Sequence, residues 1–245
     1  MSTLKPIKTC RGTINIPVTP MLPWQTALFF GIPAMLIALG FQVVLPALQN
    51  AGMARMYAYT IVECTVIGGL IPATLIAIAA EGRPLNWTTI RARLRLKPII
   101  GNSWNWMTFG ILVFVGSYYA GLWLIGALIR NLNIQLPDTT FQVDSNSAVS
   151  RALWLANIIV GLVAEEVWWR GYVLPRQELQ HGTRTWLLHG LLWALVHVSY
   201  TNWLTIGLII PSCALAFIAQ GLKNTTPCIA MQVFLNSMNL ILGGM

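Results

Sequence analysis

"ALWLANIIVGLVAEEVWWRGYVL", residues 152–174, is long and apolar enough to cross a bilayer, yet it carries two adjacent glutamates and an arginine. About 20 predominantly apolar residues are needed to span the hydrocarbon core as a helix. The whole chain has the same character, because 56% of its 245 residues are hydrophobic and only 9% are charged. Soluble domains carry about 25% charged residues. We therefore expect a polytopic membrane protein.

Seven stretches of the chain share this apolar character. Each should be helical, because a single segment in lipid can satisfy its backbone hydrogen bonds in no other way. The expected fold is an all-α transmembrane bundle of about seven spans, or eight if the third or sixth is broken. We take 1–245 as one membrane domain whose motif-bearing core is about 152–242. The expected spans are 24–48, 57–80, 104–129, 152–174, 186–200, 203–221 and 228–242.

The lysines and arginines indicate the orientation, because cytoplasmic loops are enriched in them. If the polar N-terminal segment 1–23 is cytoplasmic, only Arg55, Arg130 and Arg151 lie outside. The net charge of +8 therefore reports on topology, and we expect no nucleic-acid partner. The cations expected inside are Lys5, Lys8, Arg11, Arg83, Arg91, Arg93, Arg95, Lys97, Arg170, Arg176, Arg184 and Lys223.

Several ionisable or amide side chains fall inside the expected spans. Such groups are costly in lipid, so they usually face the bundle interior and have a function there. They are Glu63, Asn157, Glu165, Glu166, His189, His197, Gln220, Gln232, Asn236 and Asn239. These residues are the candidates for a functional site.

The two glutamates of the quoted segment have different local surroundings. Glu166 and Arg170 are four residues apart, so they share a helix face and can form an ion pair. Glu165 points about 100° away, on the stripe of Gly161, and has no cation on that stripe. An unpaired carboxyl in apolar surroundings suits a general base or acid. For Glu166 and Arg170 alone, an ion pair near the membrane edge explains the sequence equally well.

Two later helices also place polar side chains on one face. Trp193 and His197 are four residues apart, and so are Gln232 and Asn236. A membrane histidine is often only a hydrogen-bonded structural residue, and amides often bridge neighbouring helices. For Asn239, one turn further on, we favour the bridging role.

The depth of each polar side chain in the membrane distinguishes one shared site from separate hydrogen bonds between neighbouring helices. At a rise of about 1.5 Å per residue, Glu165 lies roughly 13 Å from the cytoplasmic end of its span. By the same rise, His197 lies roughly 16 Å, Asn236 roughly 15 Å and Gln232 roughly 9 Å from the ends of theirs. His189, at about 4–5 Å, is too shallow to join them easily. Three helices thus bring a carboxylate, an imidazole and carboxamides to a similar depth in the cytoplasmic half.

This combination of side chains suits the hydrolysis of a peptide bond. A carboxyl and an imidazole can activate a water molecule. Amide N–H groups can stabilise the oxyanion that forms when water attacks a carbonyl. We therefore expect Glu165 and His197 to activate water, with Gln232 and Asn236 as donors to the oxyanion.

The same residues resemble the motifs of the CAAX-protease and bacteriocin-processing family (CPBP, or ABI) of intramembrane endopeptidases. The first family motif, Glu-Glu-x-x-x-Arg, is matched by Glu165, Glu166 and Arg170. The second, Phe-x-x-x-His, reads Trp193-x-x-x-His197 here, with one aromatic residue replacing another. The motifs follow one another in the family's order on separate expected helices.

The third family motif, His-x-x-x-Asn, reads Gln232-x-x-x-Asn236, so its histidine is replaced. In the family, this histidine and asparagine form the oxyanion hole, and a glutamine amide can also donate a hydrogen bond there. Glutamine is a poor zinc ligand, however, and a catalytic zinc site needs about three good protein ligands. We therefore expect no metal ion and no other cofactor.

The resemblance also implies an all-helical bundle with a conical cavity that opens to the cytoplasm. It implies that Glu165 is the general base, that His197 helps it to activate the water, and that Asn236 donates to the oxyanion. The supporting residues that it implies are Glu166, Arg170 and Trp193.

Three functions are consistent with these observations. The leading one is an intramembrane peptidase that acts near the cytoplasmic face on a peptide or protein, such as a prenylated tail or a peptide precursor. The second is a catalytically degenerate relative that serves as a membrane binding, immunity or scaffold protein, because the amide of Gln232 cannot act as an acid. The third is a transporter with Glu63, Glu165 and His197 as a proton relay, which fits less well because the polar residues cluster in one membrane half. In each case we expect a multi-pass protein embedded in the lipid of a prokaryotic plasma membrane.

Overall fold

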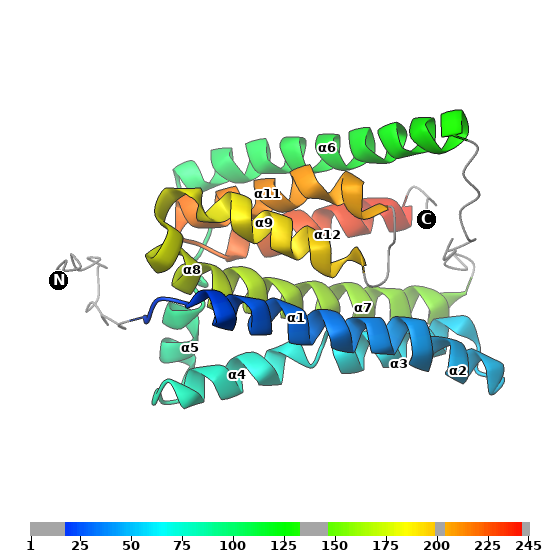
Figure 1. The fold of residues 1–245 in the computed structure, drawn as a ribbon, viewed down its shortest axis with the longest axis horizontal. Helices are drawn as coiled ribbons and strands as arrows, with labels where there is room; N and C mark the ends of the chain where they lie inside the picture. Colours follow the sequence, from blue (N-terminus) through cyan, green and yellow to red (C-terminus); the bar gives the residue numbers. More distant parts are fainter. Residues whose placement is uncertain (1–17, 133–146, 199–203, 242–245) are drawn as a thin grey trace.

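The structure, a computed structural model, describes residues 18–132, 147–198 and 204–241, and every element in these ranges is helical. The long helices lie side by side along one axis, and successive long segments run in alternating directions (Figure 1). The expected all-α class is therefore confirmed. In chain order the elements are α1 (Pro23–Leu39), η1 (Gly40–Val44), α2 (Leu45–Asn50), α3 (Arg55–Val66), α4 (Leu70–Ala80), α5 (Trp87–Arg93), α6 (Asn102–Leu132), α7 (Ala148–Glu166), η2 (Val167–Val173), α8 (Leu174–His181), η3 (Gly182–Arg184), α9 (Thr185–Val196), α11 (Leu204–Leu222) and α12 (Thr226–Ile241).

The second apolar stretch is broken, whereas the third and the sixth are continuous. α3 ends at Val66 and α4 begins at Leu70, with a turn between them. Glycine is required at Gly68 in this turn, because a Cβ there would overlap the carbonyl oxygen of Cys64. α6 and α11 show no such interruption, so the described residues provide no eighth span at either place where we had allowed for one.

In the described part of the chain, four helical segments are long and apolar enough to cross a membrane. They are Pro23–Asn50, Arg55–Ala80, Asn102–Asn131 and Ala148–Val196, and a shorter apolar helix covers Gly207–Leu222. The longest of them contains the turn at α8 and folds back on itself (Figure 1). The number of spans and the cytoplasmic N-terminus stay predictions. Residues 1–17, 199, 200, 203 and 242, which belong to the expected segments, lie outside the described part of the chain.

Most of the described cations expected inside gather at one end of the bundle. α5 and α8 lie at this end, close to the start of α1 (Figure 1). Glu178 of α8 pairs with Arg95 at 2.9 Å and with Lys223 at 2.6 Å, so it ties α8 to the segments that follow α5 and α11. The positive-inside pattern predicts such a segregation of charge. The cations expected outside, at the far ends of α3, α6 and α7, are Arg55, Arg130 and Arg151.

The outer surface of the bundle is apolar along much of its length. Met35, Trp123 and Leu112 are 73%, 71% and 68% exposed. Soluble proteins rarely expose contiguous apolar patches larger than a few hundred Å². These outward-facing side chains are suited to contact with lipid, in agreement with the apolar length of the helices.

An aromatic cluster packs η2 against α1. Phe29 stacks on Trp168 with ring centroids 5.2 Å apart, and Phe30 stacks on Trp169 at 4.5 Å. The indole N–H of Trp168 also donates to the Phe29 carbonyl at 3.3 Å. Each aromatic pair adds about 0.5–1.5 kcal/mol beyond the burial of its area. This packing fixes the rotation of the helical segment that carries Arg170.

Candidate active site

The residues of the first motif lie where α7 widens into a π-helix. Glu165 and Glu166 are the last residues of α7, and Arg170 lies within η2. π-Helical turns are rare and occur frequently at functional sites. All three residues are buried, with exposures of 6%, 0% and 0%. The junction of α7 and η2 thus brings three ionisable groups into the interior of the bundle.

Glu166 is the centre of a buried hydrogen-bond network. Arg170 Nη1 donates to Glu166 Oε1 at 2.8 Å, the partner that the four-residue spacing suggests. Gln232 Nε2, from α12, donates to the same oxygen at 2.5 Å. A buried carboxylate is very costly unless it is paired and hydrogen-bonded. The ion pair therefore belongs to the interior between α7 and α12 and not to a water-exposed edge.

Arg170 also connects the first motif to the second. Its guanidinium lies over the Trp193 ring, with Cζ 4.0 Å from the ring centroid. Trp193 in turn meets His197 edge-on, with ring centroids 4.4 Å apart. A cation–π contact that is shielded from water is worth about 2 kcal/mol. Residues of all three motifs therefore belong to one contact network.

His197 is held in one orientation by Trp193. His197 Nδ1 lies 2.9 Å from the backbone carbonyl oxygen of Trp193. A carbonyl oxygen can only accept, so we assign the proton of the neutral ring to Nδ1 and the basic lone pair to Nε2. The residue is 7% exposed. The imidazole is thus buried with a defined tautomer.

Glu165 faces a different side of α7 from Glu166. It shares its stripe with Gly161, whose missing side chain leaves room for Glu63 of α3. Glu165 interacts electrostatically with Glu63, Arg170 and Glu166. The ion pair of Arg170 is with Glu166.

The two amides of the third motif each use one N–H group within the bundle. Gln232 donates to Glu166, and Asn236 Nδ2 donates to the backbone carbonyl of Gln232 at 3.0 Å. A carboxamide has two N–H donors, so one further N–H of each side chain is not engaged in these bonds. Gln232 is 2% exposed, whereas Asn236 is half-buried.

Two other polar candidates have structural roles. Asn157 Nδ2 donates to the Thr60 hydroxyl at 3.1 Å and so joins α7 to α3. Gln220 Oε1 accepts from the backbone N–H of Trp186 at 2.8 Å, in the first turn of α9. Such amide contacts are the bridges that polar residues commonly make between membrane helices. Asn239 lies in α12, but its side chain is outside the described ones.

His189 is fully buried next to the network. Its Nδ1 lies 2.6 Å from Gln177 Oε1, and its ring meets Phe30 edge-on at 5.4 Å. Its Nε2 is buried without a hydrogen-bond partner. These contacts place His189 in the core between α1, α8 and α9.

Glu63 is a candidate that the sequence did not include in the expected catalytic group. Its Oε1 would lie 2.5 Å from a Cβ at Gly161, one turn before Glu165. Its Oε2 is buried without a hydrogen-bond partner. The sequence did mark Glu63 as an acid in an apolar span, but spacing along one helix cannot reveal which other helix that acid faces.

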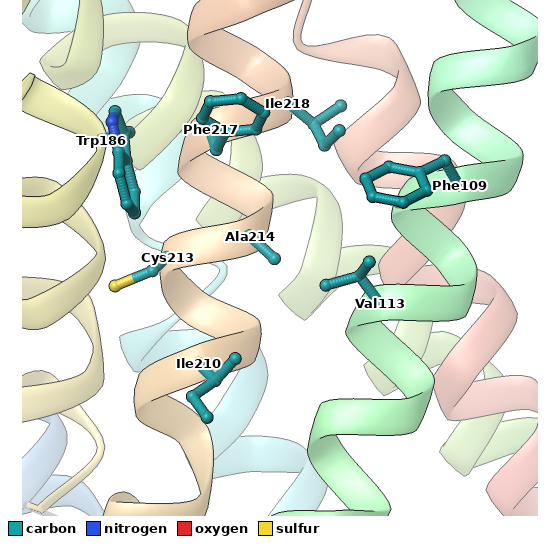
Figure 2. Close-up of a pocket in the computed structure, with 9 residues that line it drawn as sticks. Phe109, Val113, Trp186, Ile210, Cys213, Ala214, Phe217 and Ile218 are labelled. Carbon is teal, nitrogen blue, oxygen red and sulfur yellow. The ribbon is translucent and has the colours of Figure 1, made fainter. Parts of the chain in front are cut away.

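Two apolar pockets lie beside the core. One, of about 320 Å³, lies between α6, α9 and α11, and Phe109, Trp186 and Phe217 are among the residues around it (Figure 2). The other, of about 560 Å³, lies between α1, the α3–α4 turn and Trp168. Neither of the two is lined by a residue of the three motifs. Within the described ranges, no three His, Cys, Asp or Glu side chains are grouped so as to hold a metal ion.

Comparison with known families matches the part of the chain that contains all three motifs. Residues 147–238 match the family model described as Rce1-like, type II CAAX prenyl endopeptidase Rce1-like. The resemblance expected from the motifs is therefore confirmed. Searches of curated proteins and of solved structures gave no match.

Proposed function

We propose that this chain, which carries an Rce1-like domain of the CPBP family at residues 147–238, is an intramembrane peptidase that cleaves near the cytoplasmic face. The family and the apolar helices indicate a membrane protease in general. The observation that carries the finer proposal is the buried network in which Arg170 contacts both Glu166 and Trp193. Because Gln232 also reaches Glu166, that network joins three helices that bear the motifs.

Glu165 and His197 activate the water in this proposal. A water molecule has two O–H groups, so it can donate one to the Glu165 carboxylate and one to His197 Nε2. Each contact should measure about 2.6–3.2 Å. Glu165 then takes a proton from the water as its oxygen attacks the peptide carbonyl carbon. The assigned tautomer of His197 supports this role, because it leaves Nε2 as the acceptor.

Gln232 and Asn236 stabilise the oxyanion that this attack creates. Each side chain has an N–H group beyond the one described above, and donors aimed at a developing oxyanion contribute strongly to catalysis. Removal of one such donor typically costs about 10²–10³ in kcat. The hydrogen bond from Gln232 to Glu166 would hold its amide in place during the reaction.

Glu166, Arg170 and Trp193 have supporting roles. Arg170 pairs with Glu166 and stacks on Trp193, so it holds α7 and α9 at a fixed spacing. Trp193 then orients His197 through its ring and its backbone carbonyl. These three residues therefore position the groups that act on the water.

The substrate in this proposal is a peptide or protein that reaches the cytoplasmic membrane face, such as a prenylated tail or a peptide precursor. A multi-pass protein in the lipid of a prokaryotic plasma membrane fits the length and apolar character of the helices. The catalytic centre proposed here consists of protein side chains and water, with no cofactor.

The test is cleavage of a fluorogenic prenylated peptide by the purified protein in lipid nanodiscs. Glu165→Ala and His197→Ala should each lower kcat by about 10²–10⁴, because each removes a group that acts on the water. Matched controls are Glu178→Gln and His181→Ala, which change the same residue types at the basic end of the bundle. They should retain the wild-type rate within about two-fold, because both residues lie in α8, away from the contact network of the three motifs, even though Glu178→Gln loses the pairs with Arg95 and Lys223.

Cleavage that persists in both Glu165→Ala and His197→Ala would contradict the mechanism. One observation favours the degenerate alternative. Gln232 donates one of its two N–H groups to Glu166, and that N–H group cannot also bind an oxyanion. A wild-type protein that cleaves nothing, together with a Gln232→His variant that does cleave, would establish that alternative. A wild-type protein that already cleaves would remove it.

A further inference from the structure

The Glu63 carboxyl occupies a notch on α7 that only glycine can provide. A Cβ at Gly161 would lie 2.5 Å from Glu63 Oε1, far inside the normal contact distance. Gly161 and Glu165 are four residues apart, so they lie on one face of α7. Glu63 therefore enters the bundle on the face of α7 that carries Glu165, one turn away from it.

Tyr59, also in α3, helps to hold Glu63 in this notch. The Tyr59 hydroxyl, four residues earlier, hydrogen-bonds to the Glu63 carboxyl. The Tyr59 ring packs edge-on against Phe41 at 5.5 Å and lies 6.1 Å from the Trp154 ring of α7. Glu63 Oε2, in contrast, is buried without a hydrogen-bond partner. One oxygen of this carboxyl is thus free to accept or share a proton.

The charges around the pair do not balance if every acid is ionised. Arg170 interacts electrostatically with Glu165 and Glu166, and its nearest carboxylate is that of Glu166. Glu63 lies against Gly161, one turn from Glu165 on the same face of α7, so two acids occupy the same apolar part of the interior. Ionising two neighbouring carboxyls in apolar surroundings is unfavourable, so one of them keeps its proton.

We propose that Glu63 is a positioning residue for Glu165, and that the two carboxyls share one proton in a pair seated by Gly161 and held by Tyr59. This inference rests on the proposed peptidase function. In the resting state, the two carboxyls carry one proton and one negative charge between them. The negatively charged carboxylate can accept a proton from the attacking water. When that proton arrives, both carboxyls are protonated. The leaving amine then takes one proton, and the pair returns to its resting state.

The first test is a double-mutant cycle on cleavage of the same fluorogenic peptide. Gly161→Ala displaces the Glu63 carboxyl, and Glu63→Ala removes it. Each should lower kcat by up to about 10²-fold with little change in KM, because misplacing a catalytic group costs that much. The double variant should be no slower than Glu63→Ala alone, because no carboxyl is left to displace. If the fold-loss of kcat in the double variant equals the product of the losses in the two single variants, the pairing is overturned.

A conservative variant separates positioning from packing. Glu63→Gln keeps the shape of the side chain and can still bond to Tyr59, but it removes the second carboxyl from the pair. The pH profile of kcat should therefore change. The part of the curve that reports ionisation of the carboxyl pair should move by about one pH unit or more. Glu178→Gln, a matched change outside the site, should leave the profile unchanged. A wild-type rate and profile in Glu63→Gln would contradict the proposal. The other charged or titratable groups around the pair are Tyr59, Cys64, Glu166 and Arg170.

An infrared measurement tests the pair without relying on catalysis. The protonated carboxyl of the pair has a C=O stretching band whose pH titration can be followed in the purified protein. Glu63→Gln and Glu165→Gln should each alter this titration, whereas Glu178→Gln should not. If the pair is detected but no peptide is cleaved, the proposed function fails and the pairing stands. If the Glu165 band titrates identically with and without Glu63, the pairing fails whatever the enzyme does.

Discussion

At the scale of single residues, Glu166 illustrates why an ion pair persists in an apolar bundle. Its Oε1 receives N–H groups from both Arg170 and Gln232. Removing one partner of such a buried pair leaves an uncompensated charge and typically costs about 3–5 kcal/mol. The amide at position 232 thus has a structural partner in addition to the oxyanion role that we propose for it.

Glu81, just after α4, gives a residue-scale prediction outside the membrane-spanning segments. Burial alone would raise its pKa, but hydrogen bonds and charge from Arg93, with a further hydrogen bond from Arg83, lower it from 4.5 to about 2. Because the folded state binds the proton more weakly, Glu81 stabilises the fold above its ordinary pKa. This stabilisation is lost as the pH falls from about 5 toward 2.

We expect Glu81→Gln to lower the unfolding temperature at pH 7 and to flatten its decline between about pH 5 and 2. Tryptophan fluorescence during heating of the detergent-solubilised protein measures both effects. The wild type and the variant should converge near pH 2, where Glu81 is increasingly protonated. A gap between them that stays constant from pH 7 to pH 2 would contradict the assignment.

At the scale of elements, glycines determine how closely the helices approach. Gly190 of α9 faces the backbone of α11, and a Cβ there would lie 2.5 Å from the Cα of Cys213. Small residues allow membrane helices to pack backbone to backbone in this way. The contact holds α9, and with it Trp193, at a fixed distance from α11.

Gly190→Ala should therefore destabilise the bundle. Helix backbones cannot move aside as a flexible side chain can, so overpacking should cost about 1–3 kcal/mol. Gly116→Ala in α6 is the matched control, because nothing lies within 4 Å of a Cβ at that position. It should be neutral or stabilising by up to about 1 kcal/mol, as alanine favours helix. Denaturant unfolding compares the two, and equal midpoints for both variants would refute the close approach.

At the scale of the whole molecule, the segregation of charge predicts the orientation in the membrane. Asn50 ends α2 at one end of the bundle, and Thr183 lies in the η3 turn at the basic end (Figure 1). In a variant without native cysteines, Asn50→Cys should react with a membrane-impermeant maleimide on intact cells. Thr183→Cys should react only after permeabilisation. The opposite pattern would reverse the orientation expected from the lysines and arginines.

The sequence by itself determined the helices and the order of the motifs. Apolar length predicts helix directly, since lipid offers the backbone no other partner. The seven expected stretches accordingly fall on helical segments in the described residues. The pairing of Glu166 with Arg170 also followed from local spacing, because residues four apart on a helix are neighbours. The roles of Glu165, His197 and Asn236 in catalysis stay predictions.

Only the tertiary structure decided which helices face one another. Nothing in the spacing of α12 indicates that Gln232 donates to Glu166, and nothing in α3 indicates that Glu63 lies against Gly161. The stacking of Arg170 on Trp193 likewise depends on the π-helical turn and on aromatic packing against α1. Periodicity fixes the direction of a side chain relative to its own helix axis. The rotation and separation of neighbouring helices arise from side-chain packing over the whole bundle, so contacts between helices cannot be read from any one segment.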